Sequence, residues 1–161
     1  MEPRPDEIRW LTPEDLIYIN WRVVGDITPE EPIGVRDPGL LESAQQAPCQ
    51  KRYYEQTEDM FLLSAVLMSR VIRNHPFCSG NKRTGYASAY LLLWCNGYRM
   101  SAPTEEATDL CREIAIDPPH EEQVASWISD NTEPFDQVEA LTRHPGDELD
   151  SLAGRMSPSS S

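Results

Sequence analysis

The chain is short of basic residues. Its 161 residues include 14 lysines and arginines against 27 aspartates and glutamates, which gives a formal net charge of −13 at pH 7. Nucleic acids and anionic membranes attract basic surfaces, so this deficit argues against either as a direct partner. Any local group of cations therefore stands out in this sequence.

Long apolar runs and paired cysteines are also missing. The most apolar stretch, YASAYLLLWC at residues 86–95, is about half as long as a helix that crosses a bilayer. The amino terminus has no signal-like segment, and the chain has no C-x-x-C pair. The cysteines lie far apart, at Cys49, Cys78, Cys95 and Cys111. We therefore expect a soluble cytoplasmic protein with reduced thiols, a disulfide pair being the less favoured alternative.

The length suits one domain that buries a single core without metal or disulfide bonds. Residues 1–131 carry helix signals, whereas residues 132–161 are acidic and end in RMSPSSS. This predicts a folded domain over 1–131 and a disordered tail over 132–161. An inert, solubilising tail is the favoured interpretation, and docking on the protein's own cationic site or on a partner is the alternative.

Helix signals follow one another along the domain. Caps, prolines and apolar spacing predict helices over residues 13–24, 39–47, 57–74, 79–97, 103–116 and 120–131. Pro48 is expected to end the second of these helices and Thr57 to cap the third. Residues 25–38 contain two glycines and three prolines. We therefore expect an all-α fold with one irregular flap or short hairpin.

The stretch HPFCSGNKRTGY, residues 75–86, places cations at the expected start of a helix. The first amides of a helix have no internal partner and bind anions. Gly80 lets a ligand approach the backbone, and Asn81 adds an amide. Lys82 and Arg83 add charge that suits phosphate oxygens. These residues predict a phosphate-binding cradle.

His75 is expected at the carboxyl end of the preceding helix, because Pro76 disfavours helical geometry there. Across the turn from the cradle, a neutral imidazole can take a proton from a hydroxyl that attacks a bound phosphate. The alternative is that His75 only caps the helix and that residues 80–83 form a solvated first turn. The combination of these residues with Phe77 favours the phosphate site.

HPFCSGNKRT, residues 75–84, resembles the signature of the Fic/Doc family, and specifically its Doc branch. The segments LTPEDLIYIN, GVRDPGLLESA and LLLWCNGYRM follow in the Doc order, so that the resemblance covers residues 10–131. It implies a Fic/Doc-type helical bundle in which Phe77 packs the motif turn. It also implies that Gly80, Asn81 and the two cations bind nucleotide phosphates and that His75 is the base.

The resemblance also implies an activity. Fic proteins transfer AMP to proteins, whereas Doc transfers phosphate from ATP to elongation factor Tu, arrests translation and is neutralised by the antitoxin Phd. The AMP-transferring branch has glycine where this chain has Lys82 and arginine where it has Tyr86. A bulky Lys82 changes which phosphate lies in line with the attacking hydroxyl. We therefore expect a kinase-like toxin with a translation factor as target and a Phd-like antitoxin, and we expect no direct contact with nucleic acid.

Ser79 departs from the family pattern, which has an acid at this position that holds magnesium. Serine can still cap the following helix. Three interpretations remain open: Ser79 binds Mg²⁺ weakly through its hydroxyl, another carboxylate such as Asp37 reaches the site, or the domain binds nucleotide or protein without turnover.

The flap residues Gly34, Val35 and Arg36 resemble the region that aligns a target segment by strand pairing in Fic proteins. The alternative is a plain loop in which Arg36 and Asp37 form a local salt bridge, and for these two side chains this is the favoured interpretation. Beside the phosphate turn, we expect Cys78 to pack as a small apolar side chain.

Overall fold

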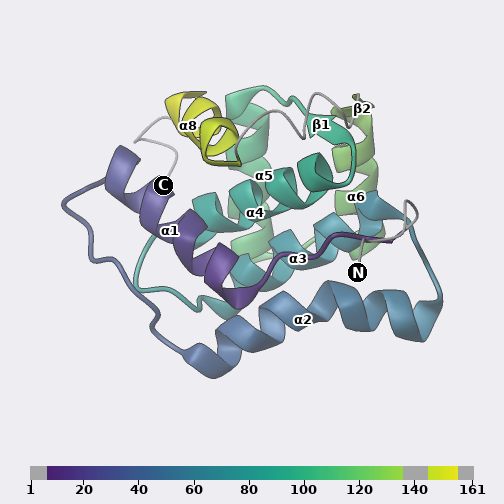
Figure 1. The fold of residues 1–161 in the computed structure, drawn as a ribbon, viewed down its shortest axis with the longest axis horizontal. Coiled ribbons are helices and arrows are strands. Elements are labelled where there is room, and N and C mark those ends of the chain that lie inside the picture. The colour runs from purple at the N-terminus through teal and green to yellow at the C-terminus, as the bar shows by residue number, and fades with distance from the viewer. Residues whose placement is uncertain (1–6, 136–144, 156–161) are drawn as a thin grey trace.

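Two buried helices form the centre of the molecule, as the all-α prediction requires. The computed structural model describes residues 7–135 and 145–155. In it α3 (Met60–Asn74) lies against α4 (Asn81–Cys95), and most side chains of both helices are buried. Figure 1 shows the other helices arranged around this pair, with α2 (Pro38–Glu55) along one side of α3. The turn between α3 and α4 carries the predicted site.

The first helix, α1 (Pro13–Ile27), is longer than predicted. Thr12 and Asp15 form a capping box at its start. At its other end the helix continues beyond residue 24 to Ile27, which is buried, and the amide of Thr28 bonds to the carbonyl of Val24 at 2.8 Å. Burial of this apolar face prolongs the helix, so the flap begins only at residue 28.

The prediction that Pro48 ends the second helix is wrong. Pro48 lies inside α2, which runs on to a left-handed Gln56. The proline ring is buried on the same face as Ala44 and Ala47, and this packing compensates for the hydrogen bond that a proline cannot donate. Asp37 caps the helix by accepting a hydrogen bond from the amide of Leu40 at 3.0 Å.

Asp59, rather than the predicted Thr57, caps α3. Its carboxylate accepts from the amides of Phe61 and Leu62 at 3.0 and 3.3 Å. The Thr57 hydroxyl accepts a hydrogen bond from the amide of Asp59, the residue before the first residue of the helix, at 3.1 Å. A carboxylate at the cap also complements the positive end of the helix.

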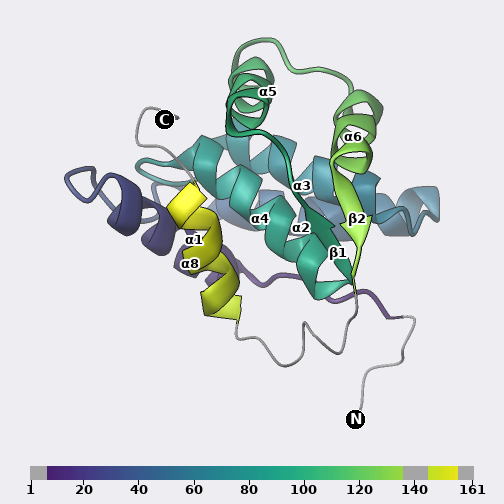
Figure 2. The same cartoon turned by 90° about the horizontal axis from the view of Figure 1, so that it is seen from above.

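The carboxyl-terminal part of the domain forms a second layer on α3 and α4. Helices α5 (Thr104–Ile116) and α6 (Glu121–Asp130) match the predicted segments and stand beside each other in Figure 2. Strand β1 (Tyr98–Met100) pairs antiparallel with β2 (Thr132–Pro134). The fold is therefore helical, with one two-stranded sheet among the described residues.

Residues from 132 onward, predicted to be a disordered tail, include two described elements, β2 and α8 (Pro145–Arg155). Helix α8 contacts α1 and α4, with Leu149 and Leu152 buried. The hydroxyl of Tyr90 donates to the buried carboxylate of Glu148 at 2.9 Å. The two leucines, three residues apart, give this acidic segment an apolar face, which the composition alone did not reveal. Residues 136–144 and 156–161 of the predicted tail lie outside the described residues.

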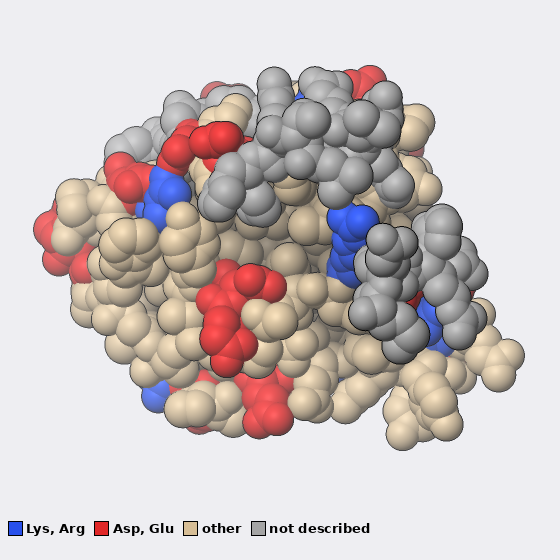
Figure 3. Space-filling model, viewed as in Figure 1, with Lys and Arg blue, Asp and Glu red and all other residues tan. Residues whose placement is uncertain are grey.

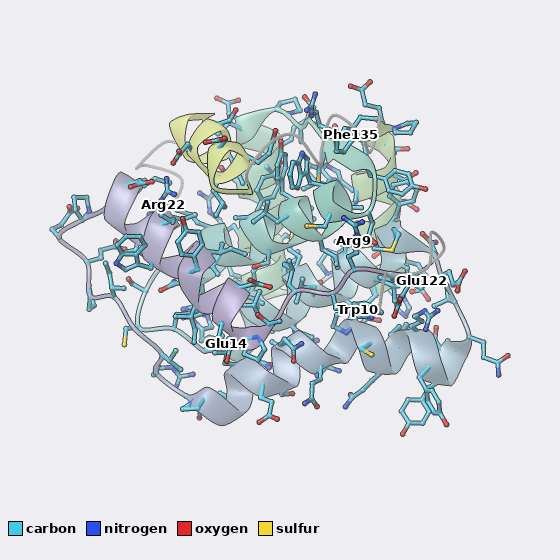
Figure 4. All side chains as sticks on the ribbon, viewed as in Figure 1. Arg9, Trp10, Glu14, Arg22, Glu122 and Phe135 are labelled. Carbon is cyan, nitrogen blue, oxygen red and sulfur yellow. The ribbon has the colours of Figure 1, made fainter. Side chains whose placement is uncertain are left out.

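An ion pair at the surface also joins α8 to α1. Arg22, labelled on α1 in Figure 4, pairs with Asp150 of α8. On the face drawn in Figure 3, acidic side chains gather in several patches and basic ones are few, as the net charge leads one to expect. None of the described helices is long and apolar enough to cross a membrane.

Candidate functional site

The turn between α3 and α4 closes around the side chain of Asn81. The Asn81 carboxamide oxygen accepts from the amide of Phe77 at 3.0 Å, and its nitrogen donates to the Phe77 carbonyl at 3.1 Å. The ring of Phe77 is buried in the core. Phe77 therefore anchors the turn, as predicted, and Asn81 fixes its backbone rather than facing solvent.

Gly80 is the cap residue of α4, and its φ of 70° lies in the left-handed region. A Cβ atom at this position would lie 2.6 Å from Cγ2 of Val24 on α1. Both the backbone angle and the space therefore require glycine. This close approach brings α1 against the start of the predicted cradle.

Asn20 on α1 holds the start of α4 and was missed in the sequence. Its side chain is buried, and its nitrogen donates to the Ser79 carbonyl at 2.9 Å and to the Thr84 hydroxyl at 3.0 Å. The available signal was a polar residue next to the buried Ile19 in an amphipathic helix.

His75 ends α3 in a left-handed conformation, and its side chain is exposed. Its Nδ1 lies 3.3 Å from the carboxamide nitrogen of Asn81. That nitrogen is a donor, because the oxygen of the same carboxamide accepts from Phe77. The contact therefore requires an unprotonated Nδ1, so the neutral ring carries its proton on Nε2. The Nδ1 lone pair of His75 thus accepts from Asn81 at the edge of the cradle, while the backbone of His75 serves as the helix cap.

Arg83 is buried, whereas Lys82 is half-exposed. The Arg83 guanidinium donates to the Thr28 hydroxyl at 3.0 Å. Burial lowers the pKa of Arg83, and the nearby charges of Glu31 and Glu30 partly oppose that shift. Arg83 is therefore a fixed positive charge behind the cradle, and Lys82 is its more accessible cation.

A cavity of about 260 Å³ brings most of the predicted site together. Its lining comprises Glu31, His75, Cys78, Ser79, Gly80, Asn81, Lys82 and Arg83. A second cavity, of about 230 Å³, has mainly apolar walls that include Tyr86, Met100, Cys111 and Leu152. Lys82 and Arg83 line both cavities. The site thus has a charged half and an apolar half that share two cations.

Ser79 does not cap α4, contrary to expectation, because Gly80 holds that position and no side chain bonds there. The Ser79 hydroxyl donates instead to the carbonyl of Pro32 at 2.6 Å. Asp37, the carboxylate considered as a replacement for the family acid, caps α2. The two side chains that were considered as metal ligands, Ser79 and Asp37, thus both form hydrogen bonds within the protein.

The flap is paired with the motif turn. Val35 forms an antiparallel bridge with Phe77, and the amide of Cys78 donates to the Gly34 carbonyl at 2.9 Å. The Arg36 guanidinium donates to the carbonyls of His75 and Asn74 at 2.7 and 3.1 Å. The alternative of a salt bridge between Arg36 and Asp37 is therefore wrong, since backbone carbonyls at the end of α3 attract the guanidinium. Target alignment by the flap stays a prediction.

Comparison with known proteins finds a match between residues 10–93 and the family model described as the Fic/DOC family. The chain is 36% identical over 84 residues to the protein named Toxin Doc of Mycolicibacterium smegmatis; the match covers 50% of this chain and 65% of that protein. It is 32% identical over 96 residues to Protein kinase doc of Escherichia phage P1, covering 58% and 72% of the two chains. The chain thus spans less than two thirds of the first relative.

Proposed function

Because the chain belongs to the Fic/Doc family, within its Doc branch, we propose that it is a Doc-like toxin that transfers phosphate from ATP to a protein hydroxyl. The observation that carries this proposal is the position of His75, whose Nδ1 lies 3.3 Å from Asn81 at the start of α4. A base and an anion-binding helix terminus thus lie on the same turn.

The two cavities support a nucleotide as the substrate. A nucleotide has an anionic end and a flat, largely apolar end, and the charged and apolar cavities share Lys82 and Arg83. The amides at the start of α4 and the two cations bind the phosphates in the charged cavity. The apolar cavity then accepts the nucleoside.

The transfer step follows from the lone pair on His75. Because Nδ1 accepts from Asn81 before the substrate binds, the target hydroxyl first replaces that donor. Nδ1 then takes the proton of the hydroxyl as the hydroxyl oxygen bonds to the γ-phosphorus of ATP. The bond from that phosphorus to the β,γ-bridging oxygen breaks, and ADP leaves with the electron pair. Lys82 and Arg83 stabilise the charge on the phosphates. Mg²⁺, when bound, would neutralise part of the phosphate charge during transfer.

Lys82 supports phosphoryl rather than adenylyl transfer, because its side chain occupies part of the charged cavity and adds a charge there. We propose a translation factor such as elongation factor Tu as the target and a Phd-like protein as the antitoxin. The hydrogen bond from Ser79 to Pro32 favours a second candidate, a domain that binds nucleotide or protein without turnover, because that hydroxyl is already engaged.

Incubation of the purified protein with ATP, Mg²⁺ and elongation factor Tu tests the proposal by the intact mass of the factor. We expect a gain of one phosphate. A gain of AMP would mean adenylyl transfer. If the mass of the factor does not change although ATP binds, either the target differs or the domain only binds.

Thiol labelling tests whether ATP occupies the charged cavity. Cys78 is exposed and lines this cavity, so the expectation that it packs as an apolar side chain is wrong. Burial raises the pKa of Cys95 to about 11 and that of Cys111 to about 12. At pH 8 we therefore expect labelling of Cys49 and Cys78 in the folded protein and little at Cys95 and Cys111.

Addition of ATP is expected to protect Cys78 at least several-fold and to leave Cys49 unchanged. Cys49 is an exposed thiol on α2 and serves as the internal control. The readout is peptide mass spectrometry after a short pulse of iodoacetamide. Equal labelling of Cys78 with and without saturating ATP would place the nucleotide elsewhere.

A further inference from the structure

The charged cavity contains one carboxylate among its described lining residues, that of Glu31. Glu31 comes from the flap, immediately after α1, and its side chain is half-buried. Nothing in the motif pattern pointed to it. It lines the cavity together with residues of the motif turn, among them Ser79, at whose position the family has an acid.

Hydrogen bonds hold Glu31 and the flap beside it in place. The amide of Glu31 donates to the Thr28 carbonyl at 2.9 Å. The Thr28 hydroxyl donates to Oε2 of Glu31 at 3.0 Å while accepting from the Arg83 guanidinium at 3.0 Å. The hydroxyl of Ser79 donates to the carbonyl of Pro32, the next residue along the flap, at 2.6 Å. Ser79 therefore ties position 79 to the segment that carries the carboxylate.

We propose that Glu31 is the carboxylate that binds the Mg²⁺ of the bound nucleotide, in place of the acid that the motif lacks at position 79. This inference rests on the proposed function, because the nucleotide phosphates provide the other anionic ligands. Mg²⁺ prefers one or two carboxylates together with phosphate oxygens and water, and the side chain of Glu31 provides one carboxylate. Ser79 is a positioning residue, since its hydroxyl fixes the flap.

The donor set of the cavity fits this role. Lys82 and Arg83 are cations and cannot bind a metal, and the Asn81 side chain is occupied by Phe77. Asp37 caps α2. Ser79 also lines the cavity, but its hydroxyl is neutral and donates to the Pro32 carbonyl. Of the three interpretations left open by the sequence, a carboxylate from the flap is thus the one that gives the described cavity an anionic ligand, although the residue is Glu31 and not Asp37.

A competing role for Glu31 gives an effect of opposite sign. Glu31 raises the pKa of Arg83 through its charge, so it could act as an internal anion that repels phosphate. In that case its removal strengthens ATP binding with or without metal. If Glu31 binds Mg²⁺, its removal weakens ATP binding only when the metal is present.

Calorimetric titration with ATP, in Mg²⁺ and again in EDTA, separates these roles for the wild type and for Glu31→Gln. The ratio of the two affinities measures the coupling between metal and nucleotide. We expect Glu31→Gln to lower this ratio by about tenfold or more, the loss typical of damaged metal sites, and to leave the affinity in EDTA within about twofold.

Glu30→Gln is the matched control. Glu30 is exposed, also acts on Arg83 through its charge and does not line the cavity. The Glu30→Gln variant loses the same charge as Glu31→Gln and is expected to keep the wild-type ratio of ATP affinities in Mg²⁺ and in EDTA. The double variant Glu31→Gln with Ser79→Asp returns a carboxylate to the cavity and is expected to recover most of the coupling. Circular dichroism checks that each variant is folded.

The outcomes are distinct. If the wild type binds no ATP in either buffer, the proposed function fails and this inference fails with it. If ATP binds but Glu31→Gln and Glu30→Gln have the same ratio, only the inference is overturned. Stronger ATP binding by Glu31→Gln in EDTA would assign Glu31 as the internal anion. If the double variant shows no coupling between Mg²⁺ and ATP, the role of Glu31 would be to hold the flap and not to bind the metal.

Discussion

His75→Ala is expected to lower the rate of phosphate transfer by a factor of roughly 100 to 10,000, the range for loss of a general base. ATP affinity should change little, because in the proposed site the start of α4, Lys82 and Arg83 bind the phosphates. The measurement is the initial rate of phosphate incorporation into the protein target, with ATP affinity determined separately by calorimetry. A fall in rate at constant affinity identifies an interaction made only in the transition state.

The backbone of His75 requires a second variant. Its φ of 49° is left-handed, a conformation that alanine tolerates poorly and asparagine tolerates better. His75→Asn therefore removes the imidazole with less strain, and it should lose activity to the same extent. The exposed side chain contacts Asn81 through Nδ1 but is not part of the apolar core, so neither variant should shift the melting temperature by more than a few degrees.

His120→Ala is the control for loss of a histidine, because His120 is exposed at the start of α6 and does not line the charged cavity. It should retain full activity. If the His75 variants transfer phosphate or arrest growth as well as the wild type does, His75 is not the base. The domain would then act by binding alone.

The helices around the site were predictable where local signals and burial agree. For α3, α4 and the turn between them, the apolar runs, Pro76 and Gly80 all indicate the same structure, and the structure has it. Pro48 shows the limit of this reasoning. A proline inside a helix is locally unfavourable, and only the packing of α2 against α3 offsets it.

The residues around the motif were less predictable than the motif itself. His75, Asn81 and Lys82 lie within one short segment whose spacing carries the signal. Asn20 and Glu31 are 59 and 48 residues before Ser79 in the chain and reach the site only because α1 packs on α4. No period or spacing in the sequence marks such contacts, since they depend on how two helices meet.

The roles of single residues changed for the same reason. Arg83 was expected to bind phosphate oxygens, and the fold buries it with its guanidinium bonded to Thr28. Ser79 was expected to cap a helix or hold a metal, yet a carbonyl of the flap accepts its hydroxyl. In both cases the flap supplies the partner, and the course of a loop is the part of a fold that local propensity determines least.

Gly80→Ala is expected to destabilise the protein by about 2 to 5 kcal/mol. Part of this is the left-handed backbone at φ 70°, which costs an L-residue roughly 1–2 kcal/mol. The rest is the contact between a new Cβ and Cγ2 of Val24 at 2.6 Å, an overpacking of the kind that costs about 1–3 kcal/mol. Urea denaturation followed by circular dichroism measures the change.

Gly25→Ala provides a control with the opposite sign. Gly25 lies within α1, and a Cβ there meets nothing within 4 Å. Alanine is the better helix former by about 1 kcal/mol, so this variant should be slightly stabilised. A Gly80→Ala variant as stable as the wild type would mean that the turn has another conformation in solution.

The double variant Gly80→Ala with Val24→Ala separates the two causes. Removal of the Val24 methyl groups relieves the contact at 2.6 Å but leaves the strain at φ 70°, so part of the Gly80→Ala loss should be recovered relative to Val24→Ala alone. ATP affinity should depend on the backbone conformation of residue 80 rather than on the contact with Val24. In the proposed site the amides of α4 bind phosphate only while residue 80 keeps its left-handed conformation. A variant that regains stability by changing that conformation would therefore lose the nucleotide.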